Sequence, residues 1–191
     1  AVIVIFAGND VANISLPENN WSFENLKFVN LARNIKTVSA EKENVGSSRE
    51  TLKMTKEKFI EVEKDRMKIN VKGAFEKEWK LFEKTIKEIR AALLKENVEF
   101  TCVVIPDEYS VNDNLYSEIT KENPTDRYYS INKIMGILQR NSINCINTTG
   151  ALQELNLNGI NPYKENDTHI NEAGNYIIFN EIRKHLDFNK R

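Results

Sequence analysis

The sequence predicts an α/β fold in which helices cover both faces of a parallel sheet. Two observations carry this prediction. Short, apolar, β-branched runs at residues 1–10, 98–106 and 142–150 are typical of strands buried inside a sheet. The segments between them have the apolar spacing of amphipathic helices, and helices between strands imply right-handed crossovers and parallel pairing. We therefore expect a three-layer αβα arrangement.

The region between the first two strands is predicted to be mainly helical. Residues 23–38 have apolar side chains at helical spacing, and the polar, turn-rich stretch 39–50 predicts a loop. A strongly charged helix, mostly a solvated face, is predicted from Thr51 to about Asn70. The clearest helix covers residues 74–97, where apolar side chains recur at steps of three and four: Phe75, Trp79, Phe82, Ile86, Ile89 and Leu93.

The second half of the chain repeats this alternation. The strand at 98–106 ends at Pro106, and a loop rich in Asn, Asp and Tyr is expected from there to about Thr125. A helix is predicted over 126–141, with Asp126 as its N-cap, and the third strand follows. The last predicted helix covers 171–186, with Asn171 well placed as its N-cap.

Length and composition indicate one soluble globular domain. The 191 residues can form a sizeable core, and we expect a single domain over 1–191 in which 40–72 are a candidate helical insertion. The net charge of −1 gives no electrostatic reason to expect nucleic acid as a partner, and no apolar run is long enough to span a bilayer. Cys102 and Cys145 lie in strand-like segments, so we favour buried free thiols over a disulfide or a metal pair.

In parallel α/β folds, ligands bind at the carboxyl ends of the strands. Three stretches stand there: Gly8-Asn9-Asp10 after the first strand, the segment from Pro106 after the second, and the segment from Asn147 after the third. The loop containing Asp167 and His169 precedes the last helix and could return to the same edge.

Asp167 and His169 have the chemistry of a general base. A histidine held by a carboxylate, with its other ring nitrogen free, can activate a serine hydroxyl. Asn9, at a strand end, could point its amide at a developing oxyanion. The competing interpretations are structural: Asn9 and Asp10 suit a turn, Asp167 suits the start of the last helix, and His169 could bond a nearby carbonyl.

Two motifs resemble the SGNH (GDSL-type) hydrolase family. "VIVIFAGND" resembles a strand ending in a Gly-Asn-Asp block whose Asn serves the oxyanion hole, and "YKENDTHINEAGNYIIFNEI" resembles the block that supplies the Asp and His of the triad. "TCVVIPDEYSV" is similar to the middle strand of a branch that includes polysaccharide O-acetyl-transferring and de-acetylating members. The resemblance implies a flavodoxin-like three-layer fold, Asp167 and His169 as catalytic residues, and Asn9 and Gly8 in the oxyanion hole.

The sequence departs from this family at the nucleophile. No Gly-Asp-Ser occurs in the 191 residues, and Ser47 and Ser48 follow no apolar strand that could present one of them as a nucleophile. Because residue 1 begins inside a strand-like run, we expect that the domain is incomplete at its N-terminus and that the Ser lies upstream. Without that strand, residues 2–6 form an apolar sheet edge, which the missing segment, a partner or a second copy could cover.

The function implied by the resemblance is a serine esterase acting on a small acyl ester, with carbohydrate O-acetyl groups as one candidate substrate. No cofactor or metal is implied. We expect a soluble domain. The sequence leaves its compartment open, and a secreted or cell-envelope location in bacteria is one option.

Two other function classes stay open. One is a non-catalytic SGNH-like module that binds carbohydrate or another partner. The other is a flavodoxin-like regulatory or nucleotide-binding domain. The sequence argues against it, because it has no Gly-rich phosphate-binding motif. Four tyrosines could line a sugar site by stacking, although we favour half-buried structural roles for them: Tyr109, Tyr128, Tyr129 and Tyr163.

Overall fold

The computed structural model describes residues 1–8, 10–12, 54–121 and 125–186. These residues lie in one compact unit, formed from the stretches 1–14 and 53–191. The predicted helix at 23–38, the loop at 39–50, and Asn9, Ser47 and Ser48 lie outside the described residues.

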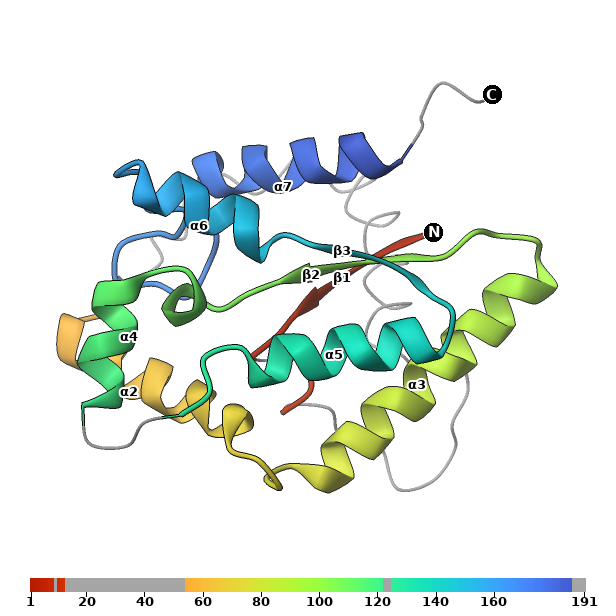
Figure 1. Cartoon of the computed structure of the whole chain (residues 1–191), viewed down its shortest axis with the longest axis horizontal. Helices are drawn as coiled ribbons and strands as arrows, with labels where there is room; N and C mark the ends of the chain where they lie inside the picture. The colour runs from red at the N-terminus through yellow and green to blue at the C-terminus, as the bar shows by residue number, and fades with distance from the viewer. Residues whose placement is uncertain (9, 13–53, 122–124, 187–191) are drawn as a thin grey trace, which may run out of the picture. The chain divides into compact units, whose positions relative to one another are not determined.

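The described part of the chain has an α/β fold built on a parallel three-stranded sheet (Figure 1). The strands are β1 (Val2–Phe6), β2 (Thr101–Ile105) and β3 (Asn144–Asn147), in the order β1-β2-β3. Both pairs are parallel, with Ile3 opposite Cys102 and Cys102 opposite Cys145. The sheet therefore brings the ends of all three strands to one edge, as the sequence predicts.

Helices connect and cover these strands. The α-helices of the described part are α2 (Lys56–Met67), α3 (Glu76–Lys95), α4 (Asp113–Thr120), α5 (Tyr129–Arg140), α6 (Thr149–Leu157) and α7 (Glu172–His185). Two single turns of 3-10 helix accompany them, η2 (Lys68–Asn70) and η3 (Glu108–Ser110).

The two faces of β2 are covered by different helices. All five β2 residues are buried. Val103 and Ile105 belong to an apolar cluster with Leu152 of α6 and Ile178 of α7. The helix α5 contacts β2 and β3, and in Figure 1 it lies on the opposite side of the sheet from α6 and α7. The middle strand is thus buried on both sides, which its continuous apolar sequence predicts.

The first strand is buried on one face only, which corrects the expectation of burial on both. Ile3 and Ile5 are buried, whereas Val2, Val4 and Phe6 are 42%, 43% and 37% exposed. Successive side chains of a strand point to opposite faces, so the exposed set shares the face that carries Val103 and Ile105 on β2. The helices of that face pack over β2 and β3, and β1 is an edge strand of the described sheet.

Two short helices replace predicted loop or strand. The stretch predicted as a loop up to Thr125 contains η3 and α4, and α4 begins at an Asn112 cap whose side chain accepts from the Leu115 N–H at 3.1 Å. The third strand stops at Asn147, and α6 begins at Thr149. Each of these α-helices has only two buried side chains, too few to show a helical period in the sequence.

The ends of the longer helices agree only partly with the predicted caps. Asn171 caps α7 by accepting from the Gly174 N–H at 3.0 Å, which confirms that prediction. The prediction for Asp126 is wrong, because α5 begins at Tyr129 after a Tyr128 cap. The Asp126 side chain instead accepts from the Tyr128 N–H at 2.9 Å, forming a turn just before the helix.

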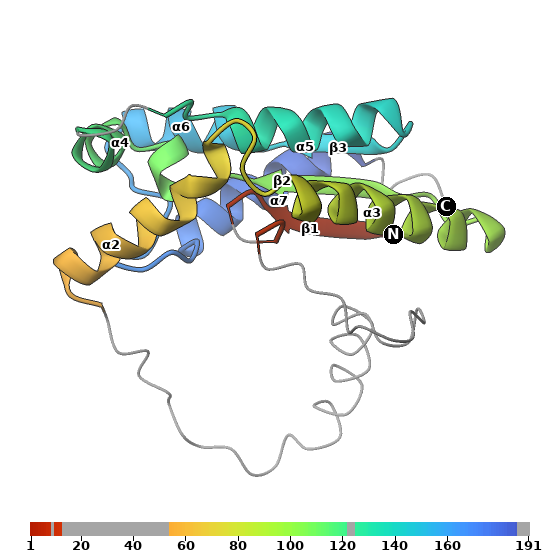
Figure 2. The same cartoon turned by 90° about the horizontal axis from the view of Figure 1, so that it is seen from below.

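The helix α2 packs onto the body of the domain through an apolar face. Phe59 and Met67 join Tyr109 of η3 and Leu115 and Ile119 of α4 in one buried cluster. Figure 2 shows α2 and α4 at the same end of the domain. Glu63 on the same helix is fully buried, which the prediction of a mostly solvated helix missed. The described part of the candidate insertion 40–72 therefore packs against the rest of the domain at this end of the sheet.

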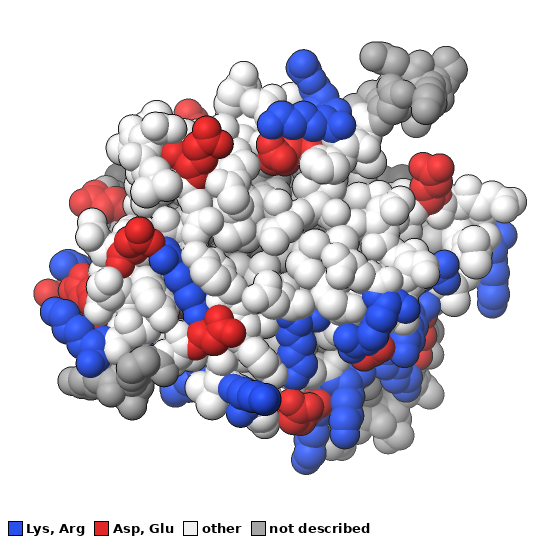
Figure 3. All heavy atoms as spheres, viewed as in Figure 1, with Lys and Arg blue, Asp and Glu red and all other residues white. Residues whose placement is uncertain are grey.

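Charged side chains of both signs occur on the surface. Figure 3 shows Lys and Arg gathered toward α3 and the lower edge of the view, with acidic side chains among them. Some link neighbouring helices, as Arg140 of α5 does with Glu83 of α3 at 2.5 Å. The hydrogen bond from Arg140, assisted by one from Lys87, lowers the pKa of Glu83 to about 2. None of the helices in the described ranges is long and apolar enough to cross a bilayer.

Candidate functional site

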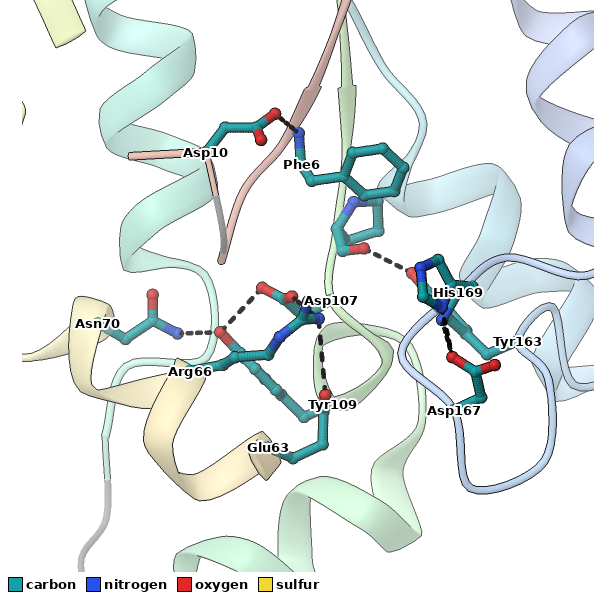
Figure 4. A network of polar contacts seen from close by, with 11 residues as sticks. Phe6, Asp10, Glu63, Arg66, Asn70, Asp107, Tyr109, Tyr163, Asp167 and His169 are labelled. Atoms are coloured by element: carbon teal, nitrogen blue, oxygen red, sulfur yellow. Dashed lines mark hydrogen bonds and ion pairs between the residues drawn. The ribbon is translucent and has the colours of Figure 1, made fainter. Parts of the chain in front are cut away.

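The loop at residues 161–171 carries Asp167 and His169 to the carboxyl edge of the sheet. Its anchor is Tyr163, whose hydroxyl donates to the Pro106 carbonyl at 2.6 Å, directly after β2 (Figure 4). Tyr163 is buried, and so is Ile170 at the other end of the loop. The sequence prediction that this loop returns to the strand ends is confirmed by this contact.

Backbone and asparagine hydrogen bonds close the loop. Tyr163 and Ile170 form an antiparallel bridge, and the Lys164 N–H donates to the His169 carbonyl at 2.9 Å. The Asn171 amide donates to the Asn161 and Tyr163 carbonyls at 2.7 and 2.9 Å. Residues 164–169 are thereby held as a turn that contains Asp167 and closes at His169.

Asp167 and His169 form a hydrogen-bonded dyad. Oδ1 of Asp167 lies 2.5 Å from Nδ1 of His169 and also accepts from the His169 backbone N–H at 3.1 Å. The Asp167 side chain is 18% exposed, whereas the His169 side chain is 75% exposed. Among the described residues, Nε2 of His169 has no hydrogen-bond partner, so it is free to meet a substrate or a nucleophile.

The ionisation of Asp167 fixes the tautomer of the neutral imidazole. Partial burial acts to raise the pKa of Asp167, but the hydrogen bonds from the His169 ring and backbone outweigh it, and the pKa is lowered. An ionised carboxylate can only accept, so Nδ1 carries the proton in this hydrogen bond. The lone pair of the neutral ring then lies on Nε2, which is the arrangement that a general base requires.

The predicted oxyanion-hole residues lie near the end of β1, but only one of them is described. Gly8 is buried and packs against the Asp107 carboxylate, which follows β2. Asn9 lies outside the described residues. Within the described part, no hydrogen bond joins Gly8 to the dyad, so the structure brings Asp167 and His169 together and places Gly8 in a separate contact at the same sheet edge.

Asp107 is the centre of a buried polar cluster that sequence reasoning did not find. Its Oδ1 accepts from Nη1 of Arg66 at 3.1 Å, and its Oδ2 accepts from the Tyr109 hydroxyl at 3.2 Å. Arg66 Nη1 also lies 3.8 Å from Oε1 of Glu63, too far for a hydrogen bond. Figure 4 shows Glu63, Arg66 and Tyr109 converging on Asp107. The Arg66 guanidinium therefore lies beside two buried carboxyl groups, with a hydrogen bond to Asp107 and a longer ion pair with Glu63.

Burial keeps the two carboxyl groups of this cluster from ionising easily. Burial, followed by the charge of Asp107, raises the pKa of Glu63 to about 8, although Arg66 acts to lower it. Burial also raises the pKa of Asp107, against the opposing effects of Arg66 and Tyr109. Perturbed carboxyl groups of this kind cluster at functional sites, although structural networks also contain them. The Asp-Glu-Tyr run after β2 is the one feature of the sequence that points to this cluster. It does not indicate which residues of α2 take part.

The tyrosines and cysteines singled out in the sequence are buried or half-buried. Tyr109 and Tyr163 are buried and Tyr128 and Tyr129 half-buried, so the first two do not offer a stacking face to a ligand. Both cysteines are free, Cys102 buried and Cys145 half-buried. In the described ranges, no group of three or more His, Cys, Asp or Glu side chains could hold a metal ion.

Comparisons with known proteins returned no relative of this chain. No protein-family model, no curated protein and no solved structure matches it.

Proposed function

We propose that this chain is the Asp-His part of a serine esterase that cleaves a small acyl ester, with carbohydrate O-acetyl groups as the candidate substrate. The observation that carries the proposal is the Asp167–His169 hydrogen bond, which leaves Nε2 exposed at the carboxyl edge of a parallel sheet. The nucleophilic Ser in this proposal lies outside the described residues.

In the proposed reaction, Nε2 of His169 takes the proton of the Ser hydroxyl as its oxygen attacks the ester carbonyl. The backbone N–H of Gly8 and the side chain of Asn9 donate to the oxyanion that develops. His169 then returns the proton to the leaving alcohol, and water cleaves the acyl-enzyme with His169 again acting as base. Asp167 holds the ring and stabilises the imidazolium through Nδ1. The mechanism as proposed needs no cofactor.

The test is esterase activity of the complete natural protein toward p-nitrophenyl acetate. We expect His169→Ala to lower kcat by a factor on the order of 10³ or more. His185→Ala is the matched control, because His185 lies in the last turn of α7 and its ring bonds only the Glu181 carbonyl. Retention of most activity in His169→Ala would remove the triad assignment.

A non-catalytic binding module is the second candidate. It is favoured by the sequence, which has no Gly-Asp-Ser among its 191 residues. A fluorophosphonate probe separates the two functions, because it labels a serine that an adjacent base activates. Labelling of one serine in the wild type, lost in His169→Ala, supports the esterase. If the correctly folded protein is not labelled, the result supports the binding module.

A further inference from the structure

The end of β1 is attached to the fold on both sides of Gly8. The Ala7 N–H donates to the Ile105 carbonyl at 3.0 Å, which extends the pairing of β1 with β2 by one residue. Asp10 then turns the chain back, because its Oδ2 accepts from the Phe6 N–H at 2.8 Å and its own N–H donates to the Phe6 carbonyl at 3.1 Å. The orientation of the Gly8 peptide therefore depends on this short turn and on the groups that pack against it.

The Gly8 N–H is the unexplained group at this strand end. Gly8 is buried, and among the described residues no atom accepts a hydrogen bond from its N–H. Buried backbone N–H groups are nearly always paired, so one without a partner has its hydrogen bond available to a ligand. Gly8 also lines a cavity of about 640 Å³, so a ligand can approach this strand end. An unpaired backbone N–H is the kind of donor that an oxyanion hole requires.

The Asp107 carboxylate packs directly against Gly8. A Cβ atom at position 8 would lie 1.9 Å from Oδ2 and 2.5 Å from Oδ1, so the carboxylate fills the space that a side chain would need. Both oxygens are held in turn, Oδ1 by Nη1 of Arg66 at 3.1 Å and Oδ2 by the Tyr109 hydroxyl at 3.2 Å. The Arg66 guanidinium offsets the charge of the carboxylate, so Asp107 adds little net charge beside a group that would bind an anion.

A buried chain of hydrogen bonds holds Tyr109 in this contact (Figure 4). Nδ2 of Asn70 donates to the Tyr109 hydroxyl at 3.3 Å, and Oδ1 of Asn70 accepts from the Ser130 N–H at 3.0 Å. Asn70, Tyr109 and Asp107 are all buried. The chain runs from the first turn of α5 through η2 and η3 to the carboxylate beside Gly8, so the support for this strand end comes from the body of the domain.

We propose that Asp107 is a positioning residue for the oxyanion donor at Gly8. Its carboxylate, held by Arg66 and Tyr109, sets the orientation of the Gly8 peptide and does not touch the substrate. An N–H that is fixed before the reaction needs no reorganisation as the oxyanion develops, so it stabilises the transition state more than the bound ester. This inference rests on the proposed esterase function.

Asp107→Asn tests this role in the complete natural protein, assayed with p-nitrophenyl acetate. We expect kcat per fluorophosphonate-labelled serine to fall at least about tenfold while KM stays within about twofold, because the oxyanion contact is made only in the transition state. Tyr109→Phe is the milder variant, since it removes only the hydroxyl that donates to Oδ2, and it should lower kcat in the same direction. Asp65→Asn is the matched control and should keep the wild-type kcat, because Asp65 pairs with Lys68 on the exposed surface of α2.

Amide NMR of the same variants reports on the strand end independently of activity. The Gly8 resonance should shift in both variants, and the Ala7 and Asp10 amides should exchange at least about tenfold faster in Asp107→Asn, because the turn loses its support. If Asp107→Asn does not fold, Tyr109→Phe decides the question by itself.

Two results overturn the positioning role while leaving the esterase in place. One is an unchanged kcat in the folded variants, which would make the contact purely structural. The other is a loss of kcat with no change at the Gly8 amide, which would mean that Asp107 acts elsewhere. A wild type that neither hydrolyses the ester nor labels with fluorophosphonate removes the proposed function itself, and this inference with it.

Discussion

Gly8 lies so close to Asp107 that a Cβ atom at position 8 would be 1.9 Å from Oδ2 of the carboxylate. Asp107 cannot move aside easily, because Arg66 and the Tyr109 hydroxyl hold its two oxygens. The contact therefore joins the ends of β1 and β2 through a glycine that has no room for a side chain.

Gly8→Ala is expected to destabilise the fold by about 1–3 kcal/mol, because the new methyl group must displace the Asp107 carboxylate from its partners. Urea denaturation measures the change. Gly150→Ala is the control, since a Cβ there meets nothing within 4 Å and position 150 lies inside α6. That substitution should be neutral or stabilise the helix by up to about 1 kcal/mol. Equal stability of Gly8→Ala and wild type would contradict the close contact.

Glu63 is expected to make stability fall as pH rises. Its pKa is about 8 in the folded chain against 4.5 for the free side chain, so between these values the folded state retains a proton that the unfolded state has lost. Stability is then highest below pH 4.5 and declines by at most about 1.4 kcal/mol per pH unit until pH passes about 8. The quantity to compare is the free energy of unfolding of wild type and Glu63→Gln across this range.

Glu63→Gln stays neutral at every pH, so the difference between the two proteins should grow in favour of the variant as pH rises. Glu61→Gln is a suitable control, because Glu61 lies on the same helix and is exposed. A difference that does not change with pH would mean that Glu63 titrates as an ordinary carboxyl group.

Asp167 is expected to set the tautomer of His169 even without substrate. Nitrogen-15 NMR of the imidazole should find the neutral ring protonated on Nδ1 in the wild type, because the ionised carboxylate accepts there. Asp167→Ala removes that acceptor, and the proton should shift toward Nε2, the usual site in a free imidazole. A wild-type ring protonated mainly on Nε2 would rule out His169 as a base through that atom.

A different substitution at the same position should act on catalysis if the protein is an esterase. Asp167→Asn is expected to lower kcat by a factor of up to about 10⁴, because the amide no longer stabilises the imidazolium and favours the wrong tautomer. The effect should appear in kcat more than in KM, since Asp167 does not touch the substrate in the proposed mechanism. A change confined to KM would assign Asp167 to binding.

The two cysteines are expected to differ in reactivity. Burial, with a smaller contribution from Cys145, raises the pKa of the Cys102 thiol to about 12, and burial also raises the pKa of Cys145, which is only half-buried. Since the thiolate is the reactive form, iodoacetamide should label Cys145 slowly and Cys102 only after unfolding. Mass spectrometry of labelled peptides measures both rates. Rapid labelling of native Cys102 would contradict its burial.

Local patterns were sufficient to predict the parts of the fold that depend on a single period or spacing. Trp79, Phe82, Ile86 and Ile89 are the buried face of α3, as their steps of three and four predict. The Asp167–His169 contact likewise follows from two residues that lie close together in the chain. The catalytic role of this pair remains a prediction, because geometry alone does not establish a reaction.

Features that depend on tertiary contacts could not be predicted in this way. Glu63 stands in a helix crowded with charges, and nothing nearby in the sequence distinguishes it from its exposed neighbours. The groups that act on its pKa include Asp107 and Tyr109, which lie more than forty positions further along the chain. The one-sided burial of β1 also depends on which helices reach the edge of the sheet, and the apolar strand sequence does not carry that information.

The anchoring of the 161–171 loop has a thermodynamic consequence for any ligand that meets His169. Tyr163 is bonded to Pro106, and Asn171 closes the loop on itself through two carbonyls. The conformational entropy of these residues is therefore lost when the chain folds, not when a ligand binds. A molecule that contacts His169 finds the imidazole already oriented, so its association free energy is not reduced by the ordering of this loop.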